Sequence, residues 1–339
     1  MRSLAFMKDG YQFWMGGLLA TQLEEITQDP HRLNSDGFWV AVVTFEGTPT
    51  FARFGKVERS EFPQSNWSGV QSNWQSSFDR EGFEGYVSAI REEISQGTVY
   101  QVNACRILKN KLTEANVPLS GLFSRLLVEN PAPYSSYVSL PDIEIASASP
   151  ELFLTVNSRE IKTSPIKGTI REDEGAFGEK DQAENLMIVD LMRNDLGRIC
   201  EPGTVEVSQL FRNEKHPGLS HLVSDVVGTL REDANWSQIL RATMPPGSVS
   251  GAPKSSALSI IKEKEGERGP YCGTIGWIHG ERALLSVAIR TFWKSGPEEI
   301  SFGTGAGITW GSNPTKEWEE TQLKARKLIS IAGGILDES

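Results

Sequence analysis

The stretch "SSYVSLPDIEIASASPELFLTV", residues 135–156, contains three short strand-like runs with only a few residues between them. The runs cover 135–139, 143–148 and 151–156, and a Pro-Asp pair typical of a turn separates the first two. Parallel strands need a crossover connection of a dozen or more residues, and these gaps are too short for one. The stretch therefore predicts antiparallel strands.

The same kinds of pattern continue along the chain. Further strand-like runs are expected at 273–278, 283–292 and 299–303. Helices are expected near 118–128, 181–196, 236–243, 255–263 and 314–332, with one more ending near Gly97 and leading into a strand. Strands that arrive in runs, rather than alternating strictly with helices, favour an α+β fold with a large antiparallel sheet.

The chain is expected to form one domain over residues 1–339. Its most loop-like region, at about 59–80, is rich in polar residues, Gly and Pro, and follows an N-terminal part of short alternating segments. No linker, internal repeat or low-complexity tract divides the sequence further. With 339 residues, 38% of them hydrophobic, the chain is long enough to bury a large core.

Charge and cysteine content disfavour several classes of protein. A formal net charge of −10 disfavours a nucleic-acid partner, which would require clustered Lys and Arg. Three widely spaced cysteines without a CxxC pair disfavour disulfides and structural zinc, and are typical of a reducing cytoplasm. Lys8 and Asp9 interrupt the first apolar run, and no later run is long enough to span a membrane. We expect a cytoplasmic protein without a membrane or nucleic-acid partner.

In "TSPIKGTIRED", residues 163–173, Lys167 stands between an isoleucine and a glycine. Two interpretations are open. The side chain can be a solvated turn residue that follows an apolar strand, since most lysines are exposed. Alternatively, a lysine shielded from water loses its proton more easily and can attack carbon, which would make Lys167 a nucleophile.

Two further acidic positions also have a structural and a catalytic interpretation. In "SASPELFL", Glu151 lies between a proline and an apolar strand, where poor hydration would keep its carboxyl protonated; the alternative is an exposed strand start. In "KDQAENLMIVDLMRNDLGRIC", a helix would place Glu184 and Asp195 near one face, with arginines as counter-charges. An ordinary ion-pair surface gives the same spacing.

The stretch "GTGAGITWGSNPTKEWEETQLKARKLISIAGG", residues 303–334, combines alternating glycines with an amphipathic helix. The glycines, which would let the backbone approach a ligand closely, are Gly303, Gly305 and Gly307. Glu317 and Glu320 share one stripe of the helix. If Glu320 converged with Glu184, the two carboxylates would suit magnesium, which binds few carboxylates and keeps its waters. The alternative is that this stretch forms only glycine turns and an ordinary amphipathic helix, without a bound metal or ligand.

Two more segments suggest contacts with an anion. "MPPGSVSGAPKSS", residues 244–256, has a glycine spacing that does not fit a phosphate loop, but backbone N–H groups leading into a helix could bind a carboxylate. Arg290 interrupts the apolar strand in "LLSVAIRTFWK". A guanidinium there needs a partner, which could be a protein carboxylate or a ligand carboxylate held through two hydrogen bonds.

Taken in order, nine segments of the sequence resemble the motifs of the chorismate-utilising enzymes. They are "GTVYQVNACR", "SPELFL", "PIKGT", "AENLMIVDLMRNDLGR", "HLVSDVVGTL", "PPGSVSGAPK", "RGPYCGTIGW", "AIRTF" and "GTGAGITWGSNPTKEWEETQLKAR". The family includes anthranilate synthase component I, aminodeoxychorismate synthase component I, and the isochorismate and salicylate synthases. The resemblance covers residues 83–332, and residues 1–80 match only weakly. It implies an α+β fold with two stacked antiparallel β-sheets, helices outside, and a central cleft for chorismate and magnesium.

The resemblance also implies a role for individual residues. Glu184 and Glu320, with Glu317 beside them, would bind magnesium, and the metal would hold the ring carboxylate of chorismate. Glu151 would be the general acid that helps the ring hydroxyl leave. The residues expected in contact with or beside the substrate are Gly168, Thr169, His221, Ser248, Tyr271, Arg290, Gly305, Ala306 and Gly307.

Lys167 is the residue that distinguishes members of the family. Aminodeoxychorismate synthases have "PIKGT", whereas anthranilate synthases have alanine at the lysine position. The resemblance therefore implies that Lys167 attacks ring carbon 2 as the carbon 4 hydroxyl departs, and that ammonia then adds at carbon 4 and expels the lysine. The product would be 4-amino-4-deoxychorismate, on the route to folate. Gln101 supports ammonia as the nucleophile, because water-using relatives have a lysine there.

The sequence departs from the family pattern in two places. Ile170 stands where many relatives have an arginine, and the "LLES" motif of tryptophan-inhibited anthranilate synthases is missing. The three cysteines also lack the glycine-flanked context of a glutaminase nucleophile, so ammonia is expected from a separate glutaminase subunit. The alternatives are anthranilate synthase component I, which also eliminates pyruvate, and a non-catalytic scaffold for a glutaminase.

Overall fold

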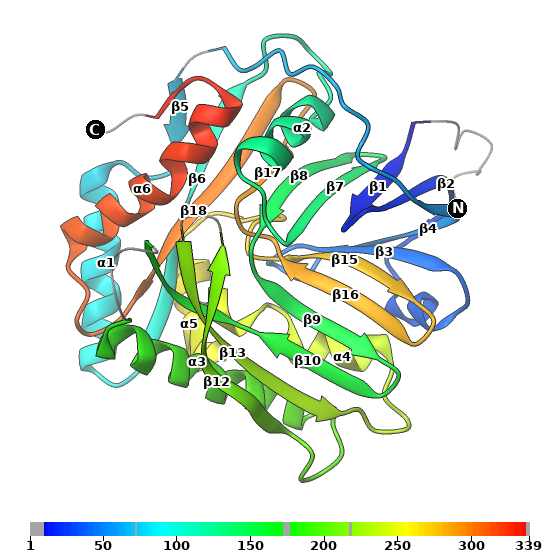
Figure 1. The fold of residues 1–339 in the computed structure, drawn as a ribbon. Helices are drawn as coiled ribbons and strands as arrows, with labels where there is room; N and C mark the ends of the chain where they lie inside the picture. Colours follow the sequence, from blue (N-terminus) through cyan, green and yellow to red (C-terminus); the bar gives the residue numbers. More distant parts are fainter. Residues whose placement is uncertain (1–9, 72, 172–176, 217–218, 337–339) are drawn as a thin grey trace.

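The computed structural model describes residues 10–71, 73–171, 177–216 and 219–336 (Figure 1). Only the backbone is described at positions 169–171, 180, 215, 216 and 219. The strands are β1 (Gln12–Met15), β2 (Leu18–Thr27), β3 (Phe38–Val43), β4 (Pro49–Arg59), β5 (Asn73–Ser76), β6 (Gln101–Lys111), β7 (Tyr134–Leu140), β8 (Ile143–Ser149), β9 (Leu152–Asn157), β10 (Glu160–Ser164), β11 (Ile166–Arg171), β12 (Glu206–His216), β13 (Leu219–Thr229), β14 (Gly251–Ala252), β15 (Thr274–His279), β16 (Arg282–Val287), β17 (Thr291–Lys294), β18 (Glu299–Ile308) and β19 (Ile335–Leu336).

The strands form one long ladder of antiparallel pairs. Its order is β5-β6-β18-β17-β8-β7-β1-β2-β4-β3-β15-β16-β9-β10-β13-β12. β11 follows β10 along the same edge of β13, and β14 pairs with the start of β6. The one parallel pair in the described part joins β19 to β5. The expected antiparallel α+β architecture is confirmed.

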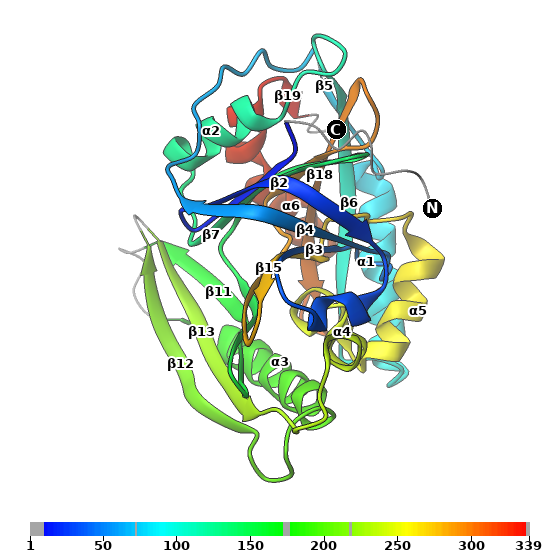
Figure 2. The ribbon, with the colours of Figure 1, turned by 90° about the vertical axis from the view of Figure 1, so that its right-hand side faces the viewer.

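Helices cover the sheet from outside (Figures 1 and 2). The α-helices of the described part are α1 (Arg80–Ser95), α2 (Ser120–Glu129), α3 (Glu179–Gly197), α4 (Trp236–Thr243), α5 (Lys254–Lys264) and α6 (Pro314–Ala332), and the short 3-10 helices are η1 (Pro30–Asn34) and η2 (Gly247–Val249). α6 packs on α1 and β18, whereas α3 packs on β13 and β11. The two helices that carry the expected metal ligands therefore approach from different parts of the sheet.

The bounds of α6 follow from its sequence. The Asn313 side chain accepts a hydrogen bond from Lys316 N, and Pro314 stands at the first helical position, where its missing N–H costs nothing. Trp318 and Ile329 lie on the buried stripe expected from the helical period. Gly333 ends the helix with a positive φ of 94°.

Two apolar clusters form the core. The larger one joins the N-terminal strands to α1, α3, α4 and α5, with Trp39 and Ile275 fully buried near its middle. The smaller one lies under α2 and α6 and contains Phe123, Phe292 and Ile329. Each cluster is formed by residues far apart in the sequence, so neither can form from local contacts alone.

Within the stretch 135–156, β7 and β8 form the expected hairpin, with Leu140 opposite Ile143. The third strand, β9, is antiparallel as expected, but it pairs with β10 and β16 instead of β8. Glu151 lies at the point where the chain leaves β8 and enters this second part of the ladder. The prolyl residue before it has no N–H for a ladder hydrogen bond, which is consistent with a break at this point.

The expected strand at 283–292 was wrong in one respect. It is two strands, β16 and β17, separated by a break that contains Arg290. Arg290 has a φ of 52°, a left-handed backbone conformation that a regular strand does not contain. Arg290 therefore does not interrupt a strand but lies at the junction between two strands.

Candidate active site

Lys167 lies in β11, at an irregularity in the pairing with β13. The register between these strands shifts between Ile166, opposite Val223, and Thr169, opposite His221. Gly168 has a φ of 81°, and a side chain there would press on Phe177 and Asp181 at the start of α3. Such a bulge changes the direction of the neighbouring side chain. Lys167 is half-buried and its Nζ donates to the Ser248 carbonyl at 2.9 Å, so the solvated-turn interpretation was wrong.

Glu151 is buried beside this lysine. It is only 4% exposed, which contradicts the exposed strand-start interpretation. Burial raises the pKa of its carboxyl, and the Ser248 hydroxyl and the positive charge of Lys167 oppose this rise. Its Oε1 atom has no hydrogen-bond partner in the described part of the chain. A buried carboxylate oxygen without a partner favours the protonated form.

Four charged groups act on the pKa of the Lys167 amine. Burial is the main cause of its lowered pKa, and the positive charge of Lys324 lowers it further. The carboxylates of Glu151, Glu184 and Glu320 act in the opposite direction. These carboxylates come from the start of β9, from α3 and from α6, so the fold brings together the acidic residues that the sequence left apart.

The carboxylates of Glu184 and Glu320 are of the kind that magnesium binds, and a pair of them would leave the remaining positions to water and substrate. Glu320 is 45% exposed and forms an ion pair with Lys324 at 2.6 Å. Glu317 lies one turn before Glu320 and is buried. Among the described residues, no three His, Cys, Asp or Glu side chains lie close enough to form a complete protein metal site.

The glycines of β18 lie within a strand rather than in turns. Their missing side chains leave room for other residues of the chain. A Cβ on Gly303 would overlap the Tyr271 ring, one on Gly305 would come within 2.6 Å of Cys105 Sγ, and one on Gly307 within 2.5 Å of Gln101 Nε2. The close approach expected of these glycines is therefore to neighbouring side chains, and Ala306, between them, is buried.

Tyr271 is buried against this strand. Burial raises the pKa of its hydroxyl, which lies 4.0 Å from Cys105 Sγ. Gln101 is also buried, and its Oε1 atom has no partner among the described residues. The strand thus places an unused hydrogen-bond acceptor next to Gly307.

Arg290 is a half-buried cation. No hydrogen bond or ion pair joins its guanidinium to any residue within the described ranges, and burial lowers its pKa. Its carbonyl accepts from Ala148 N at 3.0 Å, close in sequence to Glu151. The protein ion pair that the sequence left open is absent from the described part, which leaves the guanidinium available to an anion.

Ser248 and His221 complete the set of expected site residues. Ser248 is buried in η2, and η2 is held against α3 because Gly247 packs on Met192 and Leu191. His221 is buried on β13, directly opposite Thr169. The side chain of Thr169 lies outside the described residues, as does that of Ile170.

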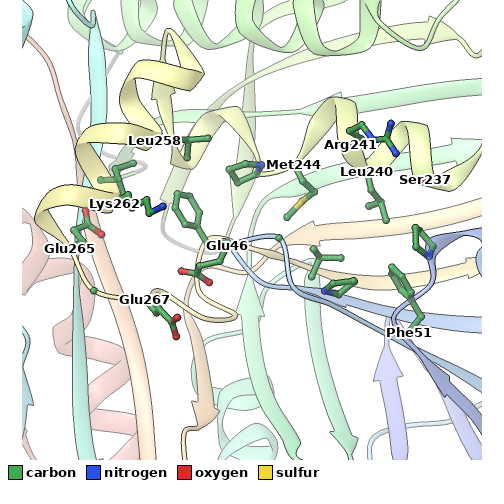
Figure 3. A pocket seen from close by; sticks show the side chains of 18 residues that line it. Glu46, Phe51, Ser237, Leu240, Arg241, Met244, Leu258, Lys262, Glu265 and Glu267 are labelled. Carbon is green, nitrogen blue, oxygen red and sulfur yellow. The ribbon is translucent and has the colours of Figure 1, made fainter. Parts of the chain in front are cut away.

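A large groove lies apart from this group of residues (Figure 3). It has a volume of about 840 Å³ and lies between the β3–β4 turn, α4 and α5. Its apolar lining includes Phe45, Phe51, Leu240, Met244, Leu258 and Ile261. None of the site residues expected from the sequence lines it, so the groove is distinct from the Lys167 site.

No helix in the described part of the chain combines the length and the apolar composition that a bilayer crossing requires.

Comparison with known proteins identifies the relatives of this chain. The family model described as "chorismate binding enzyme" matches residues 18–330, which also covers much of the N-terminal part. Anthranilate synthase component 1 of Aquifex aeolicus is 38% identical over 270 residues, covering 76% of this chain and 54% of the relative. Aminodeoxychorismate synthase component 1 of Escherichia coli K12 is 36% identical over 296 residues, covering 82% and 63%. The chain thus spans between half and two thirds of the length of these relatives.

The fold is also found among solved structures. The crystal structure of anthranilate synthase component I from Streptococcus pneumoniae TIGR4 matches with a TM-score of 0.79, covering 98% of this chain and 95% of that chain at 23% identity. MenF, the menaquinone-specific isochorismate synthase of Escherichia coli, matches with the same TM-score at 17% identity. At such low identity, the agreement shows a shared fold.

Proposed function

The chain belongs to the chorismate-binding enzyme family, and we propose that within it the protein aminates chorismate to 4-amino-4-deoxychorismate. Relatives named for the amination and for anthranilate synthesis match at similar identity, so the choice rests on the site. The observation that carries the proposal is Lys167, a half-buried amine with a lowered pKa beside the buried acid Glu151. A lysine in such surroundings is suited to nucleophilic attack.

The first half of the reaction uses Lys167 and Glu151 together. The neutral Lys167 amine attacks ring carbon 2, the ring double bonds shift, and the bond between carbon 4 and its hydroxyl breaks. Protonated Glu151 gives its proton to the departing oxygen, which leaves as water. The opposite pKa shifts of the two groups favour this starting state, a neutral amine beside a neutral acid.

The second half releases the lysine. Ammonia adds at carbon 4, the double bonds shift back, and the bond between carbon 2 and Lys167 breaks. The Gln101 Oε1 atom can accept a hydrogen bond from the incoming ammonia, because it is buried and no described residue occupies it. A glutamine amide cannot act as a base for water, which supports ammonia over water as the nucleophile.

Substrate binding depends on charge. The Arg290 guanidinium, which no described residue pairs, suits a carboxylate of chorismate. Glu184 and Glu320 would hold a magnesium ion, which would offset the charge of the ring carboxylate and orient it. For Glu320 to bind the metal, its ion pair with Lys324 must loosen.

Ammonia would come from a separate glutaminase subunit, and the product would lead towards folate. All three cysteines of the chain are buried, and burial raises the pKa of the Cys105 and Cys200 thiols. A glutaminase requires a reactive thiolate, which these surroundings disfavour. The purified chain is therefore expected to use ammonium salts at alkaline pH, and to use glutamine only after the matching glutaminase is added.

The test is a product analysis of the purified chain with chorismate, magnesium and ammonium. The expected product is aminodeoxychorismate without release of pyruvate. Without ammonia, mass spectrometry should find a chorismate-derived adduct on the peptide that contains Lys167. Fluorescent anthranilate with equimolar pyruvate would replace the proposal with anthranilate synthesis. Loss of all turnover, with intact binding of a glutaminase, would support the scaffold alternative.

A further inference from the structure

Arg268 is a buried cation that the reaction described above does not use. It lies between α5 and β15 and is 1% exposed. Its guanidinium donates to both carboxylate oxygens of Glu265 at 2.8 Å, to the Val249 carbonyl at 3.0 Å and to the Asn103 carbonyl at 2.7 Å. A single side chain thus joins η2, β6 and the residue that caps the C-terminal end of α5.

Further contacts hold Arg268 and its partner Glu265 in place. The backbone N of Arg268 donates to Glu46 at 2.7 Å, and its guanidinium lies over the Phe45 ring at 4.2 Å. Glu265, in turn, accepts from Cys105 N and from the Tyr86 hydroxyl, each at 2.9 Å. These partners hold the guanidinium in a single orientation, because its planar set of N–H donors matches their positions.

The contact with Val249 connects Arg268 to the Lys167 site. Val249 follows Ser248, whose carbonyl accepts from Lys167 Nζ and whose hydroxyl favours the charged form of Glu151. The turn that holds Ser248 is short, so a shift of the Val249 carbonyl moves the Ser248 carbonyl with it.

From these contacts we infer that Arg268 is a positioning residue, which fixes the Gly247–Val249 turn so that the Ser248 carbonyl holds the Lys167 amine. Arg268 touches neither reacting group and acts only through Ser248. The inference rests on the proposed function for its catalytic part. A misplacement of a reacting group by about 1 Å can reduce a rate about 100-fold, so a loose turn has a large effect on turnover.

The experiment compares Arg268→Gln and Arg268→Lys with the unchanged chain. We expect kcat to fall by about tenfold or more in Arg268→Gln, with the KM for chorismate changed by less than about threefold, because Arg290 is untouched. Arg268→Lys should lie between, since an ammonium keeps the charge but cannot serve Glu265 and both carbonyls at once.

A second readout follows the turn itself. Hydrogen exchange measured by mass spectrometry should show faster exchange in the peptide over residues 244–253 of Arg268→Gln. The matched control is Leu126→Ala, a fully buried residue of α2 in the smaller core cluster. It should lower the unfolding temperature without changing exchange at 244–253 or kcat at a temperature where it is folded.

Several outcomes would overturn the inference. One is wild-type kcat and wild-type exchange in a folded Arg268→Gln; if that variant does not fold, the same result in Arg268→Lys counts equally. Another is an equal kcat loss in Leu126→Ala, which would reduce Arg268 to a general stabilising role. If the unchanged chain makes no aminodeoxychorismate, the proposed function fails, and the exchange of residues 244–253 still decides whether Arg268 holds the turn.

Discussion

Two lysine–carboxylate pairs in this molecule, Lys254–Asp195 and Lys167–Glu151, have the same directions of pKa shift but different hydrogen-bond partners. Lys254, at the start of α5, donates to Asp195 of α3 at 2.6 Å and to the Thr243 carbonyl at 3.2 Å. Burial lowers the pKa of Lys254 and raises that of Asp195, as it does for Lys167 and Glu151. A perturbed pKa therefore does not distinguish a structural pair from a catalytic one here.

Hydrogen bonding separates the two pairs. Lys254 and Asp195 bond directly to each other and tie α3 to α5. Lys167 donates to a carbonyl instead, and Glu151 keeps an oxygen without a described partner. Groups that are buried and unsatisfied are costly, and such a cost is typical of sites that bind or react. The following predictions test this distinction, from the largest expected effect on turnover to the smallest.

Replacement of the proposed nucleophile, Lys167, should have the largest effect. In Lys167→Ala, turnover of chorismate with ammonium should fall by about 10⁴-fold or more, because the covalent route is lost. Lys167→Arg should fail as well, since a guanidinium stays charged. Chorismate binding measured by calorimetry should change little, because Arg290 remains. Aminodeoxychorismate formation by Lys167→Ala at the wild-type rate would mean that ammonia attacks directly.

Removal of the acid should have the next largest effect. Glu151→Gln keeps the shape of the side chain but cannot give a proton, so kcat should fall by about 10² to 10³-fold. The unfolding temperature should change little, because the amide is uncharged, as is the protonated acid that it replaces. Steady-state rates and thermal unfolding curves of Glu151→Gln and the wild type test both expectations. A variant with full activity would return Glu151 to a purely structural role.

The two carboxylates proposed to bind magnesium should have an intermediate effect. Glu184→Gln and Glu320→Gln should each raise the magnesium concentration needed for half-maximal rate by about tenfold or more. Glu319→Gln is the matched control, since Glu319 is an exposed neighbour on α6. Magnesium titrations of all three variants test this. An unchanged metal dependence in both site variants would make these glutamates ordinary surface charges.

The pH dependence of the adduct tests the state of Lys167 directly. Attack needs the neutral amine of Lys167 and the protonated acid of Glu151, so the rate of adduct formation without ammonia should pass through a maximum as pH rises. Burial lowers the pKa of Lys167, so the rising part of the profile should end below about pH 10.4, the ordinary lysine value. Rapid-quench mass spectrometry gives the profile. A rate that keeps rising above that value would contradict a shielded amine.

Replacement of the structural lysine should affect turnover least. Lys254→Met leaves Asp195, which is 2% exposed, without its partner, and should cost about 3 to 5 kcal/mol of unfolding free energy. At low temperature, where the variant is folded, kcat should stay within about twofold of wild type. Urea unfolding and steady-state rates measure the two effects. A stable but inactive Lys254→Met would break the distinction between the pairs.

Local patterns predicted much of the fold. The β7–β8 hairpin and α6 follow from alternation and from capping residues, and both formed as expected. The break at Arg290 was missed because arginine gives no sign of a left-handed backbone conformation, unlike glycine. The pairing of β9 with β16 could not be predicted either, because the local sequence does not indicate which strand lies beside which.

The candidate site, like the fold, was predicted only in part from the sequence. The sequence identified Lys167 and Glu151 as chemically unusual, but it could not show that they meet. Arg268 was missed as a residue of interest, although it lies in a segment that resembles the family. Its role depends on Asn103, 165 residues away, and on other partners that only the fold brings near.

The pairing of β6 with β18 has a consequence for synthesis on the ribosome. β6 ends at Lys111 and β18 begins at Glu299, and their ten-residue register is among the longest in the ladder. Until β18 emerges, this edge of β6 is unpaired. Glu320 lies on α6, which packs on β18, so Glu320 also cannot reach its position near Lys167 before β18 has formed. The nascent chain therefore carries an unpaired strand edge while residues 112–298 are translated, a period in which a chaperone would protect it from aggregation.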